Sequence, residues 1–129
     1  MLENQGKDSD VFCLLPTKIA ANTEEATGGW IPIANSVGDL VVLCNVGSVT
    51  GSITPLIQTA IDDMGTGAIE MTANEYGNFE SVTAETSPRL QKRLYDARSS
   101  LGFVRFAGTI TTGPVCVGAT LQARPKYLE

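Results

Sequence analysis

Short hydrophobic runs alternate with small and polar residues along this chain, which is the pattern of β-strands joined by turns. The clearest case lies between residues 38 and 61, where apolar runs at 40–46 and 53–61 flank the small-residue bend 47–51. This arrangement predicts a β-hairpin with a five-residue loop. The first run is apolar at successive positions, so we expect a central strand that is covered on both faces. Pro55 removes a backbone donor from the second run and favours a sheet edge or a bulge.

A second hairpin is predicted near the end of the chain, where runs 102–110 and 114–121 flank a Thr-Thr-Gly-Pro turn. The second of these runs alternates most regularly, and its apolar face consists of Val115, Val117, Ala119 and Leu121. A first strand is predicted at 11–19, with a bend or bulge at Pro16. Shorter strand candidates lie at 30–33, 68–71 and 78–83.

One stretch after residue 86 fits a helix. Ser87 is a suitable cap, Pro88 suits the first helical position, and Leu90 and Leu94 recur on one face. This pattern predicts a helix over residues 89–99. An extended reading, a strand followed by a turn, remains open for the same residues.

Composition favours a single all-β domain. The 129 residues are 43% hydrophobic and only 18% charged, and they include 13 glycines. We expect an antiparallel β-sandwich or jelly-roll-like barrel over residues 11–123 with at most one short helix, preceded by a loose arm at 1–10 and followed by a tail at 124–129. The sequence shows neither a signal peptide nor a run as long as a membrane span, so we expect a cytosolic origin.

The sequence predicts no catalytic, metal or cofactor site. The three cysteines, Cys13, Cys44 and Cys116, stand alone in apolar runs, and we expect them to be buried and reduced. The chain has no histidine, which removes the commonest general base and metal ligand. Asp62 and Asp63 precede a glycine-rich bend but lack EF-hand spacing, so a solvated turn is favoured. An enzyme is therefore the least favoured class of function.

Charge is unevenly distributed along the chain. Residues 19–88 contain nine acids and no Lys or Arg, whereas residues 89–126 contain seven bases and one acid. The two parts either neutralise each other within one sandwich or dock neighbouring copies. The net charge of −5 argues against nucleic-acid binding. Trp30 is either a partly buried lid of the core or a surface anchor. The candidate interface residues are Trp30, Arg89, Lys92, Arg93, Arg98, Arg124 and Lys126.

The order of these motifs resembles a group of small tailed-phage virion proteins. The resemblance covers residues 28–125 and includes a Gly-Trp start, the segments VVLCNVG and SITPLIQ, an acidic glycine-rich bend, and GFVRFAGTITTGPVCVGATL. Members of the group show "vvvnvG…vtlqeSdDgt.W" followed by "RYVRv…tvtg…vsvgA.v". Gln58, Asp62, Asp63 and residues 102–106 stand at the matching positions. This chain has no Trp after the Asp62–Asp63 bend.

The resemblance implies a capsid decoration or cement protein that binds the outside of the head between subunits of the major capsid protein. It also implies self-association, with a trimer favoured. From the acidic net charge and the lack of a long apolar run, we expect neither a nucleic-acid nor a membrane partner. The protein would be made in the host cytoplasm and lie on the capsid exterior. Open alternatives are a head–tail connector or tail component, and a carbohydrate- or host-surface-binding β-sandwich module. The last would need an exposed aromatic platform built from Trp30, Tyr76 or Tyr95.

Overall fold

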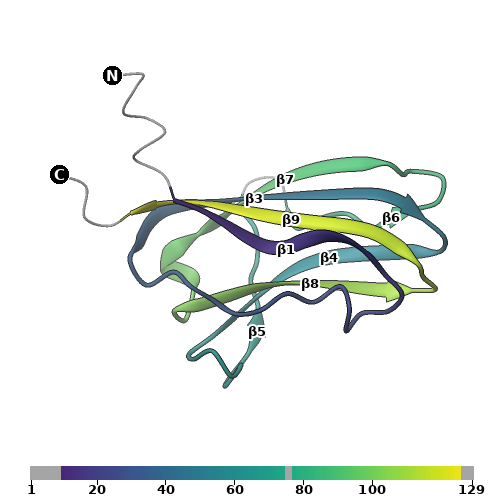
Figure 1. The fold of residues 1–129 in the computed structure, drawn as a ribbon. Coiled ribbons are helices and arrows are strands. Elements are labelled where there is room, and N and C mark those ends of the chain that lie inside the picture. Colours follow the sequence, from purple (N-terminus) through teal and green to yellow (C-terminus); the bar gives the residue numbers. More distant parts are fainter. Residues whose placement is uncertain (1–9, 75–76, 126–129) are drawn as a thin grey trace.

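The computed structural model describes residues 10–74 and 77–125 as two antiparallel β-sheets packed face to face (Figure 1). Sheet A has the strand order β1-β9-β3-β7, and sheet B has the order β2-β8-β4-β5 with β6 also paired to β4. The predicted antiparallel sandwich is thus confirmed. The elements are β1 (Asp10–Ala20), β2 (Ile31–Pro32), β3 (Ser36–Val49), β4 (Ser52–Ala60), β5 (Ile69–Glu70), β6 (Val82–Thr83), β7 (Arg89–Asp96), the 3-10 turn η1 (Ala97–Ser99), β8 (Phe103–Thr111) and β9 (Val115–Pro125).

The strand order is that of a jelly roll that stays open as two sheets. Strands β1, β3 and β9 lie in sheet A, and their chain neighbours β2, β4 and β8 lie in the same relative positions in sheet B. The short strands β5 and β6 both pair with β4 and together take the place of one edge strand. This arrangement of two Greek keys is the double-sheet solution to the exposed-edge problem of all-β domains.

Both predicted hairpins are wrong, because the two strands of each lie in different sheets. The chain crosses from sheet A to sheet B between β3 and β4, and back from sheet B to sheet A between β8 and β9. The crossings touch each other: the Gly51 amide donates to the Thr112 carbonyl at 3.0 Å, and the Thr50 amide donates to the Pro114 carbonyl at 3.2 Å. A glycine-containing turn between two apolar runs serves a hairpin and a crossing equally well, so the local sequence does not separate them.

The predicted helix is also wrong, and the extended reading of the same residues is confirmed. Strand β7 pairs with β3 from Asp39 opposite Asp96 to Val46 opposite Arg89, and only the short turn η1 follows it. Tyr95 on this strand points into the core, whereas Leu90 is exposed. The ladder with β3 outweighs a helical spacing that packing does not support.

The inner faces of the two sheets form one hydrophobic core. The side chains of Phe106 and Ile57 from sheet B meet those of Leu40 and Tyr95 from sheet A, and all four are buried. Burial of a large apolar side chain contributes about 1.5–3 kcal/mol, which makes this layer the main source of stability. Alternation on β9 is as predicted, because Val115, Val117, Ala119 and Leu121 are all buried.

Strand β3 is central in its sheet, as predicted, because it pairs with β9 on one side and β7 on the other. The expectation that both of its faces are covered is wrong for the single chain. Val42 and Cys44 are fully buried on the inner face, but Leu43 is 37% exposed on the outer face, where Asn45 is exposed as well. The sequence therefore has the apolar pattern of a doubly covered strand, and the fold covers one side of it.

Other strand predictions are confirmed in part. Strand β1 has bulges on either side of Leu15, close to Pro16. Strand β4 is central rather than at an edge, but Pro55 lies between the stretches that pair with β6 and β5, where β4 has a partner only on the β8 side. The predicted arm at 1–10 lies outside the described residues apart from Asp10, which begins β1, and β9 extends into the predicted tail as far as Pro125.

The three cysteines differ in exposure. Cys44 is buried, and burial raises the pKa of its thiol to about 12. Cys116 is half-buried and Cys13 is exposed, so the prediction of three buried cysteines is correct for Cys44 alone. All three are free thiols on strands of sheet A. Among the described residues, no helix is long and apolar enough to cross a membrane.

Candidate interaction surfaces

The described part of the chain contains no group of three or more His, Cys, Asp or Glu side chains placed to hold a metal ion. Its two buried polar side chains are used structurally. The Thr59 hydroxyl donates to the Phe103 carbonyl and accepts from the Leu101 amide, both at 2.8 Å. The Gln91 amide group accepts from the Glu80 amide and donates to the Glu80 carbonyl, both at 3.0 Å. These groups hold loops against the sandwich, and the remaining candidates for function lie on its surfaces.

Trp30 precedes β2 and packs against the loop formed by residues 61–70. The guanidinium carbon of Arg105, on β8, lies 4.4 Å from the centroid of the indole ring, and the Arg105 Nε donates to the Gln58 side chain at 2.7 Å. Gly65 approaches the ring from the loop so closely that a Cβ there would lie 3.2 Å from the indole nitrogen. Trp30 is half-buried in this stack and supports the 61–70 loop.

The 61–70 loop forms a turn around the Asp62 carboxylate. Its Oδ1 accepts the Met64 and Thr66 amides, both at 3.0 Å. Hydrogen bonds from the side chain and backbone of Thr66, and then from other loop amides, lower the pKa of Asp62 below its usual value. Gly65 and Gly67 both have positive φ, which closes the turn. The Asp62–Asp63 bend is therefore a turn stabilised from within the loop.

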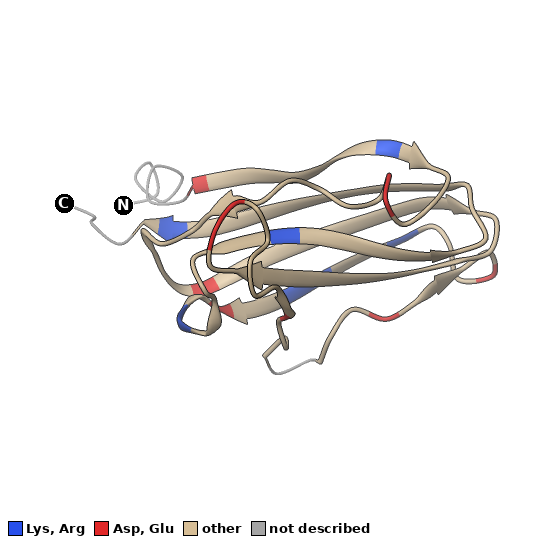
Figure 2. Cartoon of the chain, turned by 90° about the horizontal axis from the view of Figure 1, so that it is seen from below, with Lys and Arg blue, Asp and Glu red and all other residues tan. Residues whose placement is uncertain are grey.

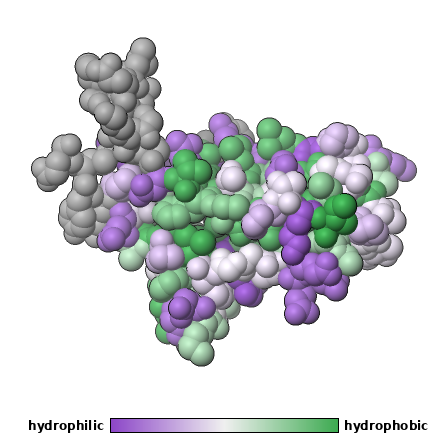
Figure 3. Space-filling model, in the orientation of Figure 1, coloured by the Kyte–Doolittle hydropathy of each residue, from purple (hydrophilic) through white to green (hydrophobic). Residues whose placement is uncertain are grey.

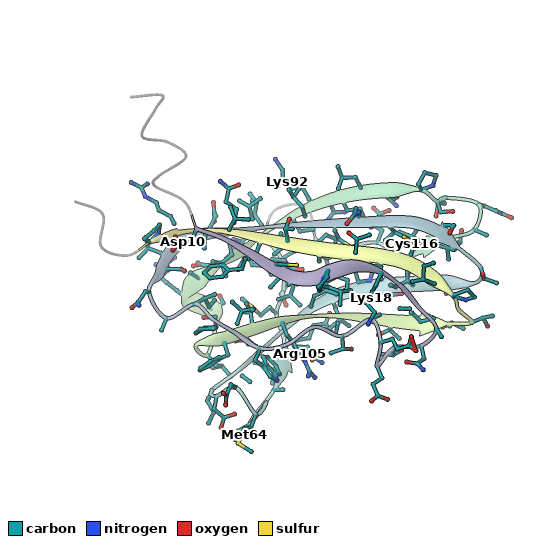
Figure 4. The ribbon with its side chains drawn as sticks, in the orientation of Figure 1. Asp10, Lys18, Met64, Lys92, Arg105 and Cys116 are labelled. Carbon is teal, nitrogen blue, oxygen red and sulfur yellow. The ribbon has the colours of Figure 1, made fainter. Side chains whose placement is uncertain are left out.

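The predicted basic residues of β7 are engaged to different degrees. Arg89 forms an ion pair with Glu80 at 3.1 Å. Arg93 lies over the Phe79 ring, 5.6 Å from its centroid, and donates to the Asn78 carbonyl. Lys92 is exposed and points away from the body of the sandwich (Figure 4). The segment around residues 78–80 thus lies along β7 and occupies two of its three bases.

The other predicted interface residues lie elsewhere. Arg98 in η1 pairs with Asp96 at 3.1 Å. Arg124 is exposed near the end of β9, where it pairs with Val37 of β3, and Lys126 lies outside the described residues. The structure therefore does not gather the predicted set into one patch. Along the chain as described, the bases sit mainly within strands, whereas most acids sit in the connections (Figure 2).

Sequence reasoning missed the most unusual surface, the outer face of sheet A, which we call the sheet A face. Its exposed apolar side chains include Val11 and Ile19 on β1, Leu43 on β3 and Leu90 on β7, with exposures of 72%, 70%, 37% and 69%. Charged side chains are rare in its centre, where Lys92 lies opposite Leu43. Figure 3 shows hydrophobic residues gathered over the middle of the molecule, where β1 and β9 lie. The outward-pointing side chains of the sheet A face include Val11, Cys13, Ile19, Val41, Leu43, Asn45, Leu90, Lys92, Leu94, Cys116, Thr120 and Gln122, with the charged Asp39, Asp96 and Arg124 away from its centre.

The sheet A face contains an open depression of about 400 Å³ at the end where the chain crosses between sheets. Gly47 has no side chain there, and a Cβ on it would lie 3.2 Å from the Cβ of Cys116. The residues that line the depression are Asn45, Val46, Gly47, Pro88, Arg89, Leu90 and Cys116. The lining is thus mainly apolar, with the Asn45 side chain among it and Arg89, which pairs with Glu80, at the rim.

No known protein family matches the sequence, and no curated protein is similar enough to count as a relative.

Proposed function

We propose that this chain is a structural protein of a tailed-phage virion, a capsid decoration or cement protein that binds the outside of the head and stabilises contacts between major capsid protein subunits. The observation that carries the proposal is the sheet A face. Strand β3 has the apolar pattern of a strand covered on both faces, yet Leu43 is exposed. A partner that covers this face completes the pattern, and flat surfaces poor in charge at their centre are typical of protein–protein interfaces.

The fold and the resemblance add separate support. Double-sheet jelly rolls recur in viral capsid proteins, lectins and cupins, so the fold fits a capsid protein without selecting it. The resemblance of residues 28–125 to small phage virion proteins favours the capsid among these. A decoration protein also needs a rigid body whose many weak contacts are repeated over a shell, and a well-packed sandwich meets that need.

The alternative of a carbohydrate-binding module receives no support from the aromatic residues that the structure describes. The platform expected for such a module would include Trp30 or Tyr95. Tyr95 is only 1% exposed because it lies in the core, and this burial is the main cause of the raised pKa of its hydroxyl. Trp30 has Arg105 over one face of its ring and Gly65 against its edge. Tyr76 lies outside the described residues.

The proposal is tested by mixing the purified chain with phage heads that lack it and sedimenting the heads. We expect the chain to sediment with the heads and to raise the temperature at which they open. Absence of co-sedimentation at every salt concentration tried would reject the decoration role. Binding to tails or to the connector but not to heads would favour the alternative virion location.

Matched surface variants test whether the sheet A face makes the contact. Val11→Asp and Leu43→Asp place a charge on this face, and Thr109→Asp places one on an exposed position of β8 in sheet B. We expect about tenfold or greater loss of head binding for the first two, because an unpaired charge is forced into an apolar contact. The Thr109 variant should bind like the unmodified chain. Equal losses in all three would contradict a contact through the sheet A face.

A further inference from the structure

The 61–70 loop projects from the sandwich with an apolar tip. Met64 at the tip is 86% exposed, and Ile61 and Ile69 at the base of the loop are also exposed. Figure 3 shows the loop standing out below the body of the molecule. A single exposed apolar residue is ordinary, but three on one projecting loop indicate a contact surface. Methionine is common in such surfaces because its unbranched side chain adapts to irregular pockets.

The loop is held in one shape before it meets a partner. Asp62 fixes the turn through the Met64 and Thr66 amides, and the Ile61 amide donates to the Thr66 carbonyl at 3.1 Å. Trp30 supports the turn at Gly65, and the Arg105 guanidinium lies over the Trp30 ring. A segment that is already ordered loses little conformational freedom on binding, so its exposed tip contributes more of its burial energy to affinity.

The depression on the sheet A face complements this loop in shape and in charge. Its lining is mainly apolar, with Val46, Pro88, Leu90 and Cys116, and its volume of about 400 Å³ is ample for the tip of the loop. Lys92 lies beside it on the exposed face of β7, next along the same face from Leu90. The loop carries only acidic charge, from Asp62, Asp63 and Glu70. An apolar tip with acidic flanks therefore faces an apolar floor with a basic rim.

We propose that the 61–70 loop of one copy of this chain docks into the depression on the sheet A face of a second copy. Figure 4 places Met64 and Cys116 on opposite sides of the molecule, so the loop does not reach the depression of its own chain. The contact is heterologous, because a different surface is used on each copy. Such contacts close into a ring or continue as an open row, depending on the rotation between copies.

This contact goes beyond the proposed function, because its partner is a second copy of the same chain and it can form in the purified protein without phage heads. It leaves the β1 side of the sheet A face open for another protein. Head binding and self-association are therefore measured in separate experiments, and either result stands without the other.

The first experiment uses the native thiol in the depression. In a Cys13→Ser background, Met64→Cys places a thiol at the loop tip, and mild oxidation with oxidised glutathione joins it to Cys116 of a second copy if the two meet. Each new disulfide passes two electrons and two protons from its two thiols to one glutathione disulfide, which becomes two molecules of reduced glutathione. Thr109→Cys in the same background is the control, because Thr109 is exposed on the outer face of sheet B.

We expect the Met64→Cys chain to form interchain disulfides about tenfold faster than the control, and peptide mapping to place them between residues 64 and 116. Crosslinking no faster than in the control rejects the contact. Crosslinks found only between residue 64 of one copy and residue 64 of another also reject it, because they report pairing of loop with loop. Cys44 is buried and is not expected to react.

The second experiment exchanges the charges. Asp63→Lys and Lys92→Glu should each weaken self-association about two- to fivefold, which is typical of exposed ion pairs, and the double variant should recover most of the loss. Sedimentation equilibrium measures the association constants, and circular dichroism confirms that each variant folds. Single reversals without effect, or a double variant no stronger than the singles, would overturn the assigned pairing of surfaces.

Discussion

The outer faces of the two sheets differ, although both belong to the same sandwich. The outer face of sheet B is polar and internally bonded: Arg105 donates to Gln58, and the hydroxyls of Thr54 and Ser81 are 2.5 Å apart. The sheet A face instead exposes Val11, Ile19, Leu43 and Leu90. Side chains that satisfy one another across strands suit a surface that stays in water. An apolar face without such pairs suits a surface that is covered in the working assembly.

The largest expected effect separates the inner from the outer faces. Phe106→Ala should lower the free energy of unfolding by about 3–5 kcal/mol, because Phe106 is fully buried between the sheets. Leu43→Ser and Thr109→Ser, one on each outer face, should change it by no more than about 0.5 kcal/mol. Urea unfolding followed by fluorescence measures all three. A large loss for Leu43→Ser would mean that the sheet A face stabilises the isolated chain and is not reserved for a partner.

The next effect concerns the crossings that join the two sheets. A Cβ on Gly51 would lie 2.3 Å from the Thr111 carbonyl oxygen, so Gly51→Ala should cost about 1–3 kcal/mol of stability through backbone displacement. Gly29→Ala is the matched control, because a Cβ there meets no atom within 4 Å. Thermal unfolding of both variants provides the comparison. Equal stability of the two variants would show that the crossings adjust easily and do not fix the position of one sheet relative to the other.

A smaller effect is expected where the edge of sheet A is closed by the segment at residues 78–80. Gln91→Leu removes both hydrogen bonds to the Glu80 backbone and should cost about 1–2 kcal/mol, because those backbone groups lose their partners. Gln122→Leu, at an exposed position on β9, is the control. Hydrogen exchange at Glu80 should rise in the first variant alone. If it does not, Gln91 is not what closes this edge.

The smallest effect is a local pH dependence of the 61–70 loop on the sheet B side. The pKa of Asp62 is lower in the folded loop than in the unfolded chain, so its stabilising contribution is complete above the unfolded pKa of about 4 and is lost as the pH falls through the folded value. The protection of the Met64 and Thr66 amides, corrected for the intrinsic pH dependence of exchange, should therefore fall on acidification, and Asp62→Asn should remove this response. Asp63→Asn should retain it. An unchanged response in the Asp62 variant would assign it to another group.

The sequence predicts the class of fold and the direction of many side chains, because alternation is a local property. Val115 and Val117 lie on the buried face as their spacing indicates, and β1 is bulged near Pro16. Sheet membership is not local. Strand β3 pairs with β9 and β7, both far along the chain, and nothing near residues 47–51 indicates that β4 belongs to the other sheet.

The candidate surfaces are predictable only in part. The sequence marks Trp30 because it is the one tryptophan of the chain, but its role in supporting the 61–70 loop depends on Arg105 and Gly65, which reach it only through the fold. The sheet A face did leave a signal, since the run at residues 40–46 is apolar at positions that point both ways. That pattern predicts that both faces of the strand are covered, and the single chain covers only the inner face. The missing cover is an interface that sequence periodicity alone does not identify.

Asp10 at the start of β1 lies opposite Ala123 near the end of β9 (Figure 1). A short linker from Pro125 at the end of β9 to Asp10 would produce a circularly permuted chain, opened at the exposed Ala84–Glu85 turn, that keeps the strand pairings of both sheets. A peptide or fluorescent domain fused to the start of β1 or to the end of β9 would project from the same corner of the sandwich. The same geometry makes the protein a practical display scaffold, since cargo attached there stays clear of the depression at the far end.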